Sequence, residues 1–123
     1  MKRVLFASFI LGALLAFSSC GKSNPDIPKA IEEMIQRSLD QPDCCDFIYI
    51  NQVLRYQYDG QEVYLVLSSG GIAGWEYHEI YNAKGAKLGS AIYNHLHIQL
   101  ENTGCFKDFL EKGVFEKQVW PTE

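Results

Sequence analysis

The stretch Gln52–Leu67, QVLRYQYDGQEVYLVL, decides the fold of this chain. Asp59-Gly60 at its centre favours a two-residue type I′ turn, and strand-forming residues lie on either side of it. The predicted pairs are Tyr58 with Gln61, Tyr56 with Val63, Leu54 with Leu65 and Gln52 with Leu67 on one face, and Arg55 with Tyr64 and Val53 with Val66 on the other. The first face is the more apolar in both strands, so turn chemistry and side-chain pattern agree on one register and predict a β-hairpin.

Upstream of the hairpin, residues 26–39 read DIPKAIEEMIQRSL and have the spacing of an amphipathic helix. The apolar positions are Ile27, Ala30, Ile31, Met34, Ile35 and Leu39, and the polar face carries Glu32, Glu33, Gln36 and Arg37. Pro28 lies near the start of this segment and Pro42 follows it, which places the end of the helix before Pro42.

Downstream of the hairpin, the pattern predicts further strands and one short helix. The predicted strands are Trp75 to Tyr81, Lys87 to Tyr93, His95 to Leu100 and an edge strand Val114 to Trp120, with a turn at Asn82-Ala83-Lys84-Gly85. Thr103 is expected to cap a helix that buries Phe106, Phe109 and Leu110 and ends at Gly113. The predicted fold class is therefore α+β: an antiparallel β-sheet of four to six strands with an N-terminal helix and a short late helix packed on one face, in one domain spanning 26–123.

The first residues have the layout of an export signal. Lys2 and Arg3 precede an uncharged apolar run from Val4 to Phe17, which is shorter than the ~20 residues of a membrane-spanning helix. The sequence Phe17-Ser18-Ser19-Cys20 then resembles the lipobox of bacterial lipoproteins. This resemblance implies a signal peptide over 1–19, a diacylglyceryl group on the Cys20 sulfur, and a lipidated tether over 20–25.

The charge of the exported chain argues against one class of partner. Without residues 1–19 the chain loses Lys2 and Arg3, which leaves 9 basic against 15 acidic residues and a net charge of −6. An acidic surface repels phosphate backbones, so we expect no nucleic-acid partner.

A wider resemblance rests on four segments: Tyr56–Tyr64 (YQYDGQEVY), Ile80–Gly85 (IYNAKG), Gly104–Phe109 (GCFKDF) and Val119-Trp120. In this order they resemble the landmarks of a family of small secreted bacterial lipoproteins of unknown function. The resemblance covers about two thirds of the mature chain. It implies a fold and an exported location, and no activity.

Besides Cys20, the mature chain holds Cys44, Cys45 and Cys105. In an oxidising compartment we expect one disulfide from Cys105 to either Cys44 or Cys45, which would close a loop of about 60 residues and stabilise the fold by ~4 kcal/mol. A vicinal Cys44–Cys45 bond and a buried free cysteine are the alternatives.

Metal ligands form a second set of candidates. Asp43-Cys44-Cys45-Asp46 together with His95 and His97 has the ligand types for zinc or copper, and on a strand the two histidines would project from one face. No defining ligand spacing is present, and the alternative is two solvent-facing imidazoles.

The sequence contains candidate catalytic side chains but no pattern that combines them into a catalytic site. Ser68, Ser69 and Ser90 lie in no nucleophile elbow, and alternation along the predicted strand separates Glu76 and His78 from Glu79. We therefore expect no enzymatic activity.

Aromatic side chains suggest binding instead. Trp75, Tyr77 and Tyr81 share one strand face and could form a platform for a sugar, peptide or protein, with ordinary core or edge packing as the alternative.

The sequence thus favours a lipid-anchored cell-envelope protein with a small non-catalytic binding or scaffolding domain. Its expected partners are the membrane, through the Cys20 lipid, and an envelope protein or glycan, with no cofactor beyond that lipid. Gly21 does not indicate retention at an inner membrane, so an outer membrane is favoured. A metal-binding lipoprotein and an inhibitor or immunity-like lipoprotein are the alternatives.

Overall fold

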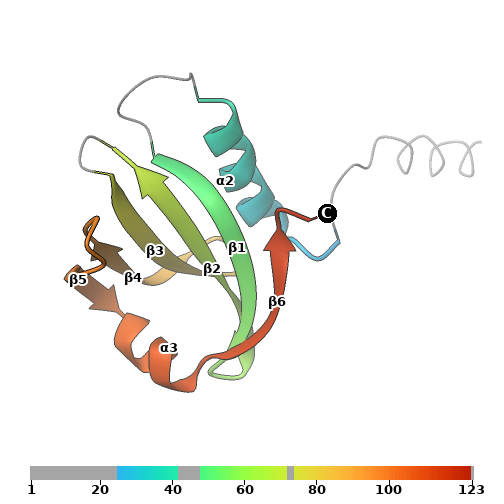
Figure 1. Cartoon of the computed structure of the whole chain (residues 1–123). Helices are drawn as coiled ribbons and strands as arrows, with labels where there is room; N and C mark the ends of the chain where they lie inside the picture. Colours follow the sequence, from blue (N-terminus) through green and yellow to red (C-terminus); the bar gives the residue numbers. More distant parts are fainter. Residues whose placement is uncertain (1–24, 42–47, 72–73, 123) are drawn as a thin grey trace, which may run out of the picture.

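Six antiparallel strands form one curved sheet in the computed structural model, which describes residues 25–41, 48–71 and 74–122 (Figure 1). The elements are α2 (Lys29–Leu39), β1 (Ile48–Tyr58), β2 (Gln61–Gly70), β3 (Trp75–Asn82), β4 (Lys87–Tyr93), β5 (Gln99–Gly104), α3 (Phe106–Lys112) and β6 (Val114–Trp120). The strand order is β5-β4-β3-β2-β1-β6, so β6 returns beside the first strand as a sheet edge. The predicted α+β class, the two helices and the edge position of β6 are confirmed.

The β1–β2 hairpin has the predicted turn and register. Asp59 and Gly60 take φ values of 52° and 75°, which are the left-handed values of a type I′ turn. Every predicted pair is present, from Tyr58 with Gln61 at the turn to Gln52 with Leu67. The local turn therefore sets the alignment of the two central strands.

Strand β2 is buried on both of its faces. Val63 and Leu65 belong to one hydrophobic cluster, while Tyr64 and Val66 belong to another. Because successive side chains of a strand point to opposite faces, the two clusters lie on opposite sides of the sheet. The core is thus two half-cores that share β2.

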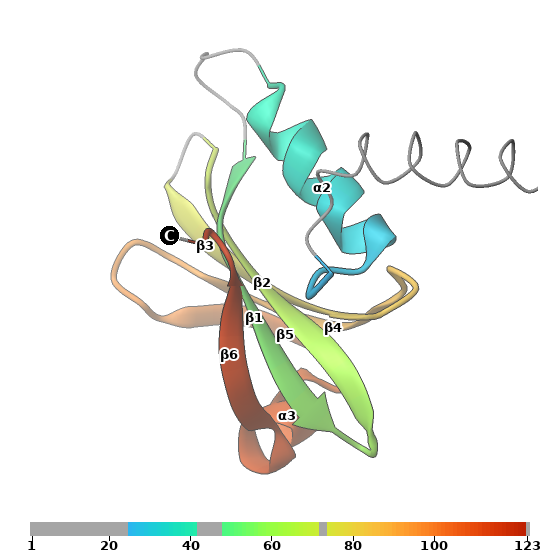
Figure 2. The same cartoon turned by 90° about the vertical axis from the view of Figure 1, so that its right-hand side faces the viewer.

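Each helix covers one of these half-cores. Ile31 and Ile35 of α2 pack with the cluster that holds Val66, and Phe106 and Phe109 of α3 pack with the cluster that holds Val63. Figure 1 shows α2 on one side of the curved sheet and α3 on its concave side, and Figure 2 shows α2 beside the upper part of the strands and α3 near their lower end. The expectation that both helices pack on one face is wrong, because β2 is apolar on both faces and each face requires its own cover.

The corner that leads from β5 into α3 depends on glycine. Gly104 has a φ of 62°, and a Cβ atom there would collide with the carbonyl oxygen of Leu88. Thr103 lies within β5 and hydrogen-bonds Ser90 at 2.8 Å between the hydroxyl oxygens, so it does not cap the helix as predicted. The N-cap residue is Cys105, whose side chain makes no capping hydrogen bond.

Several apolar residues of the predicted helices and strands are exposed. They are Leu39 at 58%, Leu96 at 64%, Ile98 at 56%, Leu100 at 48% and Leu110 at 60% exposed. Three of them, Leu96, Ile98 and Leu100, belong to the β4–β5 connection and to β5, which is the edge strand of the sheet. Periodicity alone could not distinguish these positions from core positions.

Substitutions at two neighbouring residues of α3 test which side of this helix packs against the sheet. Phe109 is 2% exposed and its ring lies 4.8 Å from that of Tyr56, whereas Leu110 is 60% exposed. We expect Phe109→Ala to lower the free energy of unfolding by about 3–5 kcal/mol. Leu110→Ala, the matched control, should change it by less than about 0.5 kcal/mol. Chemical denaturation measures both values, and equal losses would contradict the placement of α3.

Candidate functional site

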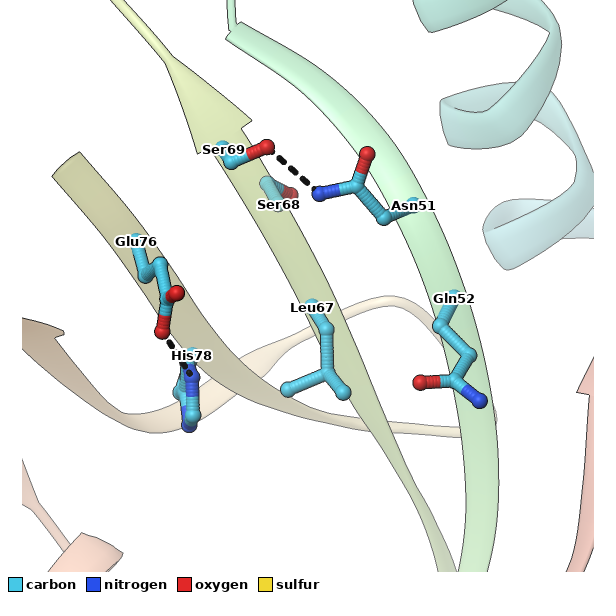
Figure 3. Close-up of a pocket in the computed structure, with 7 residues that line it drawn as sticks. All are labelled: Asn51, Gln52, Leu67, Ser68, Ser69, Glu76 and His78. Carbon is cyan, nitrogen blue, oxygen red and sulfur yellow. Dashed lines mark hydrogen bonds and ion pairs between the residues drawn. The ribbon is translucent and has the colours of Figure 1, made fainter. Parts of the chain in front are cut away.

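An open pocket of about 240 Å³ lies on the concave face, beyond the part that α3 covers (Figure 3). Residues from β1, β2 and β3 line it: Asn51, Gln52, Leu67, Ser68, Ser69, Glu76 and His78. Three adjacent strands therefore direct polar side chains toward one point of the sheet.

A β-bulge in β1 creates one wall of this pocket. Ile50 pairs with Ser68 and Gln52 pairs with Leu67, so Asn51 is the extra residue between the two pairs. In a regular strand, residues two apart share a face, so Ile50 and Gln52 would point to the same side. Because of the bulge, Ile50 packs against the α2 half-core while Gln52 lines the pocket. The bulge thus lets one short segment serve both faces.

Hydrogen bonds hold the bulge in place from both sides of the sheet. The backbone N–H of Ile50 donates to Ser38 Oγ of α2 at 2.8 Å, and the Ser38 side chain is buried. On the concave side, Asn51 Nδ2 donates to Ser69 Oγ at 2.6 Å. The helix on one face therefore stabilises the strand irregularity that shapes the other.

Glu76 connects two imidazoles at the pocket rim. Its Oε2 atom lies 3.8 Å from His78 Nε2 and 3.5 Å from His97 Nδ1. The His78 ring also packs against Tyr93, with 4.7 Å between ring centroids. Burial lowers the pKa of His78, and the nearby Glu76 carboxylate offsets this only in part, so the imidazole is neutral at pH 7.

The structure places His95 and His97 in a turn, so the prediction that they project from one strand face is wrong. The Asn94 side chain competes with the strand ladder here, because its Oδ1 accepts hydrogen bonds from the backbone N–H groups of Leu96 (2.9 Å) and Ile98 (3.0 Å). His97 has a φ of 62°, and β5 begins only after this segment. Of the two histidines, His97 lies within ion-pair distance of Glu76.

The predicted aromatic platform lies on the α2 side of the sheet. Strand pairing places Trp75, Tyr77 and Tyr81 on one face, as expected, and it is the face opposite the pocket. Tyr81 packs against the α2 half-core, and burial raises the pKa of its hydroxyl to about 12. A binding role for this platform stays a prediction.

Two of the three candidate nucleophiles are hydrogen-bonded to neutral groups, and the third is buried. Ser69 accepts a hydrogen bond from the Asn51 amide, and Ser90 bonds the Thr103 hydroxyl. Ser68 is 5% exposed. The hydrogen-bond partners of Ser69 and Ser90 are thus an amide and a hydroxyl, neither of which is a general base.

The acidic residues around His78 lie on two faces of β3, as alternation predicts. Glu76 faces His78, whereas Glu79 pairs on the other face with Lys87, with 2.7 Å between Oε2 and Nζ. The two carboxylates thus cannot act together on one substrate atom.

Among the cysteines, only Cys105 lies in the described part of the chain. It is half-buried at the start of α3, and its backbone N–H donates to the Leu88 carbonyl at 3.1 Å. Burial raises the pKa of its thiol. Cys20, Cys44 and Cys45 lie outside the described residues, so both the lipidation and the disulfide stay predictions.

The pocket residues Asn51 and Gln52 were not among the sequence-predicted sites. The predicted hairpin register places Gln52 beside Leu67 on one face, and this pairing is the sequence feature that indicates a polar side chain at this part of the sheet. The Asn51 bulge has no signature in the sequence pattern, because it depends on contacts with α2 and β2.

Comparisons with known proteins found no matching family model, no matching curated protein and no matching solved structure. Within residues 25–41, 48–71 and 74–122, no group of three or more His, Cys, Asp and Glu side chains is arranged to hold a metal ion. In the same part of the chain, no helix has the length and apolar content needed to cross a membrane.

The neutral His78 predicts a pH dependence of stability. Its pKa in the folded state lies below the unfolded value of 6.5, so the unfolded chain binds more protons as the pH falls, and stability decreases below about pH 6.5. We expect the midpoint temperature of thermal unfolding to decrease as the pH is lowered from 7.5 to about 5. In His78→Gln, the midpoint temperature should depend less steeply on pH. His95→Gln, which removes an exposed imidazole, is the matched control. An unchanged slope in His78→Gln would contradict the burial of a neutral imidazole.

Proposed function

We propose that this protein is a lipid-anchored cell-envelope protein whose single domain binds a ligand or partner without chemical turnover. The observation that carries the binding role is the convergence of polar side chains from three strands on the open concave-face pocket. Pockets with a few convergent polar groups are the usual places where small domains bind their ligands.

The entry point of the chain supports this arrangement. Asp26 Oδ2 lies 2.6 Å from Lys117 Nζ of β6, and Asp26 Oδ1 lies 3.7 Å from Arg55 Nη1 of β1. Arg55 lies on the α2 face, since it follows Val53 by two residues along β1 and pairs with Tyr64. A tether that joins the domain at Asp26 is therefore attached on the α2 face. The concave face, on the opposite side of the sheet, stays accessible to a ligand.

The sequence supplies the anchor. Export patterning over 1–19 and the lipobox-like Phe17-Ser18-Ser19-Cys20 support a diacylglyceryl group on Cys20, at the end of a tether spanning 20–25. Because each buried CH₂ group contributes ~0.8 kcal/mol, two or more acyl chains hold a small domain firmly at a membrane surface. An outer membrane is the favoured location, and an envelope protein or glycan the favoured partner.

Metabolic labelling tests the anchor. In cells grown with an alkyne analogue of palmitate, we expect the full-length protein to be labelled and to sediment with membranes, and Cys20→Ser to abolish the label. Cys105→Ser, which removes a cysteine within the folded domain, should keep it. A label that persists in Cys20→Ser, or a wild-type protein without label, would refute the anchoring.

A substrate panel tests the absence of turnover. We expect the detergent-purified lipoprotein to hydrolyse no ester, peptide, phosphate or glycoside above the uncatalysed rate. Any turnover that disappears in Ser69→Ala or His78→Gln would place a reaction at the pocket and overturn the non-catalytic assignment.

A further inference from the structure

The hydrogen-bonding groups around the concave-face pocket are both donors and acceptors. Gln52 donates its amide N–H to Gln118, which leaves its carbonyl oxygen directed toward the pocket (Figure 3). Ser69 accepts from Asn51, so its own O–H proton is available to donate elsewhere. The Glu76 carboxylate adds acceptors. This mixture suits hydroxyl groups, which donate and accept at the same atom.

The charge of the pocket argues against a strongly ionic ligand. None of the described residues that line it is a lysine or an arginine, so an anion would meet the Glu76 carboxylate without a compensating cation. A cation would find a single carboxylate, Glu76, whose Oε2 atom already contacts His78 Nε2 at 3.8 Å and His97 Nδ1 at 3.5 Å, whereas cation sites use several oxygen ligands. The balance of charges therefore favours a neutral polar ligand.

Apolar and aromatic side chains lie beside these polar groups. Leu67 forms part of the lining, and the ring of Tyr93 packs against the lining residue His78 with 4.7 Å between ring centroids. Such ring surfaces pack against the C–H faces of a ligand while polar groups hold its edge. With a volume of about 240 Å³, the pocket is smaller than the ~300–1,000 Å³ of sites for drug-sized molecules.

From these observations we propose that the concave-face pocket binds a neutral saccharide, through one or two of its sugar rings. Gln52 and Glu76 accept hydrogen bonds from sugar hydroxyls, and Ser69 donates one. This inference rests on the proposed function, because it names the ligand class of the same binding domain. Many copies anchored on one membrane would bind a polymeric glycan by avidity, although each open pocket binds weakly.

Two arrays, probed with the same detergent-purified full-length lipoprotein, test the proposal: one of neutral, acidic and basic oligosaccharides, and one of short peptides. We expect binding to neutral oligosaccharides, which titration in solution then measures. Gln52→Ala on β1 and Glu76→Gln on β3 should each weaken that binding by about tenfold or more. Gln57→Ala removes the same amide from the far end of β1, outside the pocket, and should change the affinity by less than about twofold.

The outcomes separate this inference from the proposed function. If the protein binds only peptides, and Gln52→Ala and Glu76→Gln abolish that binding, the saccharide inference is refuted. The proposed function as a binding domain is then retained. Saccharide binding that both variants keep would refute this pocket as the site. If neither array shows binding that depends on these residues, then both the saccharide inference and the binding role of the concave face fail. Labelling at Cys20 is measured independently of all three results.

Discussion

The two-sided burial of β2 is the constraint on which the rest of the domain depends. Four consecutive residues, from Val63 to Val66, are buried, and alternation sends them in turn to opposite faces of the sheet. Covering a Val or Leu side chain contributes ~1.5–3 kcal/mol, so leaving either face of β2 open to water would cost several such contributions. The α2 and α3 helices meet this requirement on one face each.

The division of the two faces explains where the pocket lies. α3 is short, and on the concave face it covers the half-core that includes Val63 and Ile80. Farther along the same strands, the residues that face this side become polar, and Ser69 and Glu76 replace the apolar positions. An uncovered stretch of sheet therefore carries side chains that tolerate water and can exchange it for a ligand.

The bulge at Asn51 links the two faces. It turns Ile50 toward α2 and Gln52 toward the pocket, and Ser38 of α2 accepts the hydrogen bond from the Ile50 N–H. A buried N–H without an acceptor would cost ~1–3 kcal/mol, so this serine helps to stabilise the irregular strand. The concave-face pocket thus depends on a contact made on the opposite side of the sheet.

The sequence by itself determined the features that rest on local chemistry. Asp59-Gly60 specified the turn and with it the pairing of β1 and β2, because positive φ values and a two-residue loop leave one register. The expectation of an export signal before Cys20 rests only on a run of side-chain types. Only the tertiary structure decided which face each helix covers, because one apolar stripe fits either side of a strand that is apolar on both. It also decided the Asn51 bulge and the Asn94 turn, since each replaces a regular ladder with hydrogen bonds that strand periodicity does not reveal.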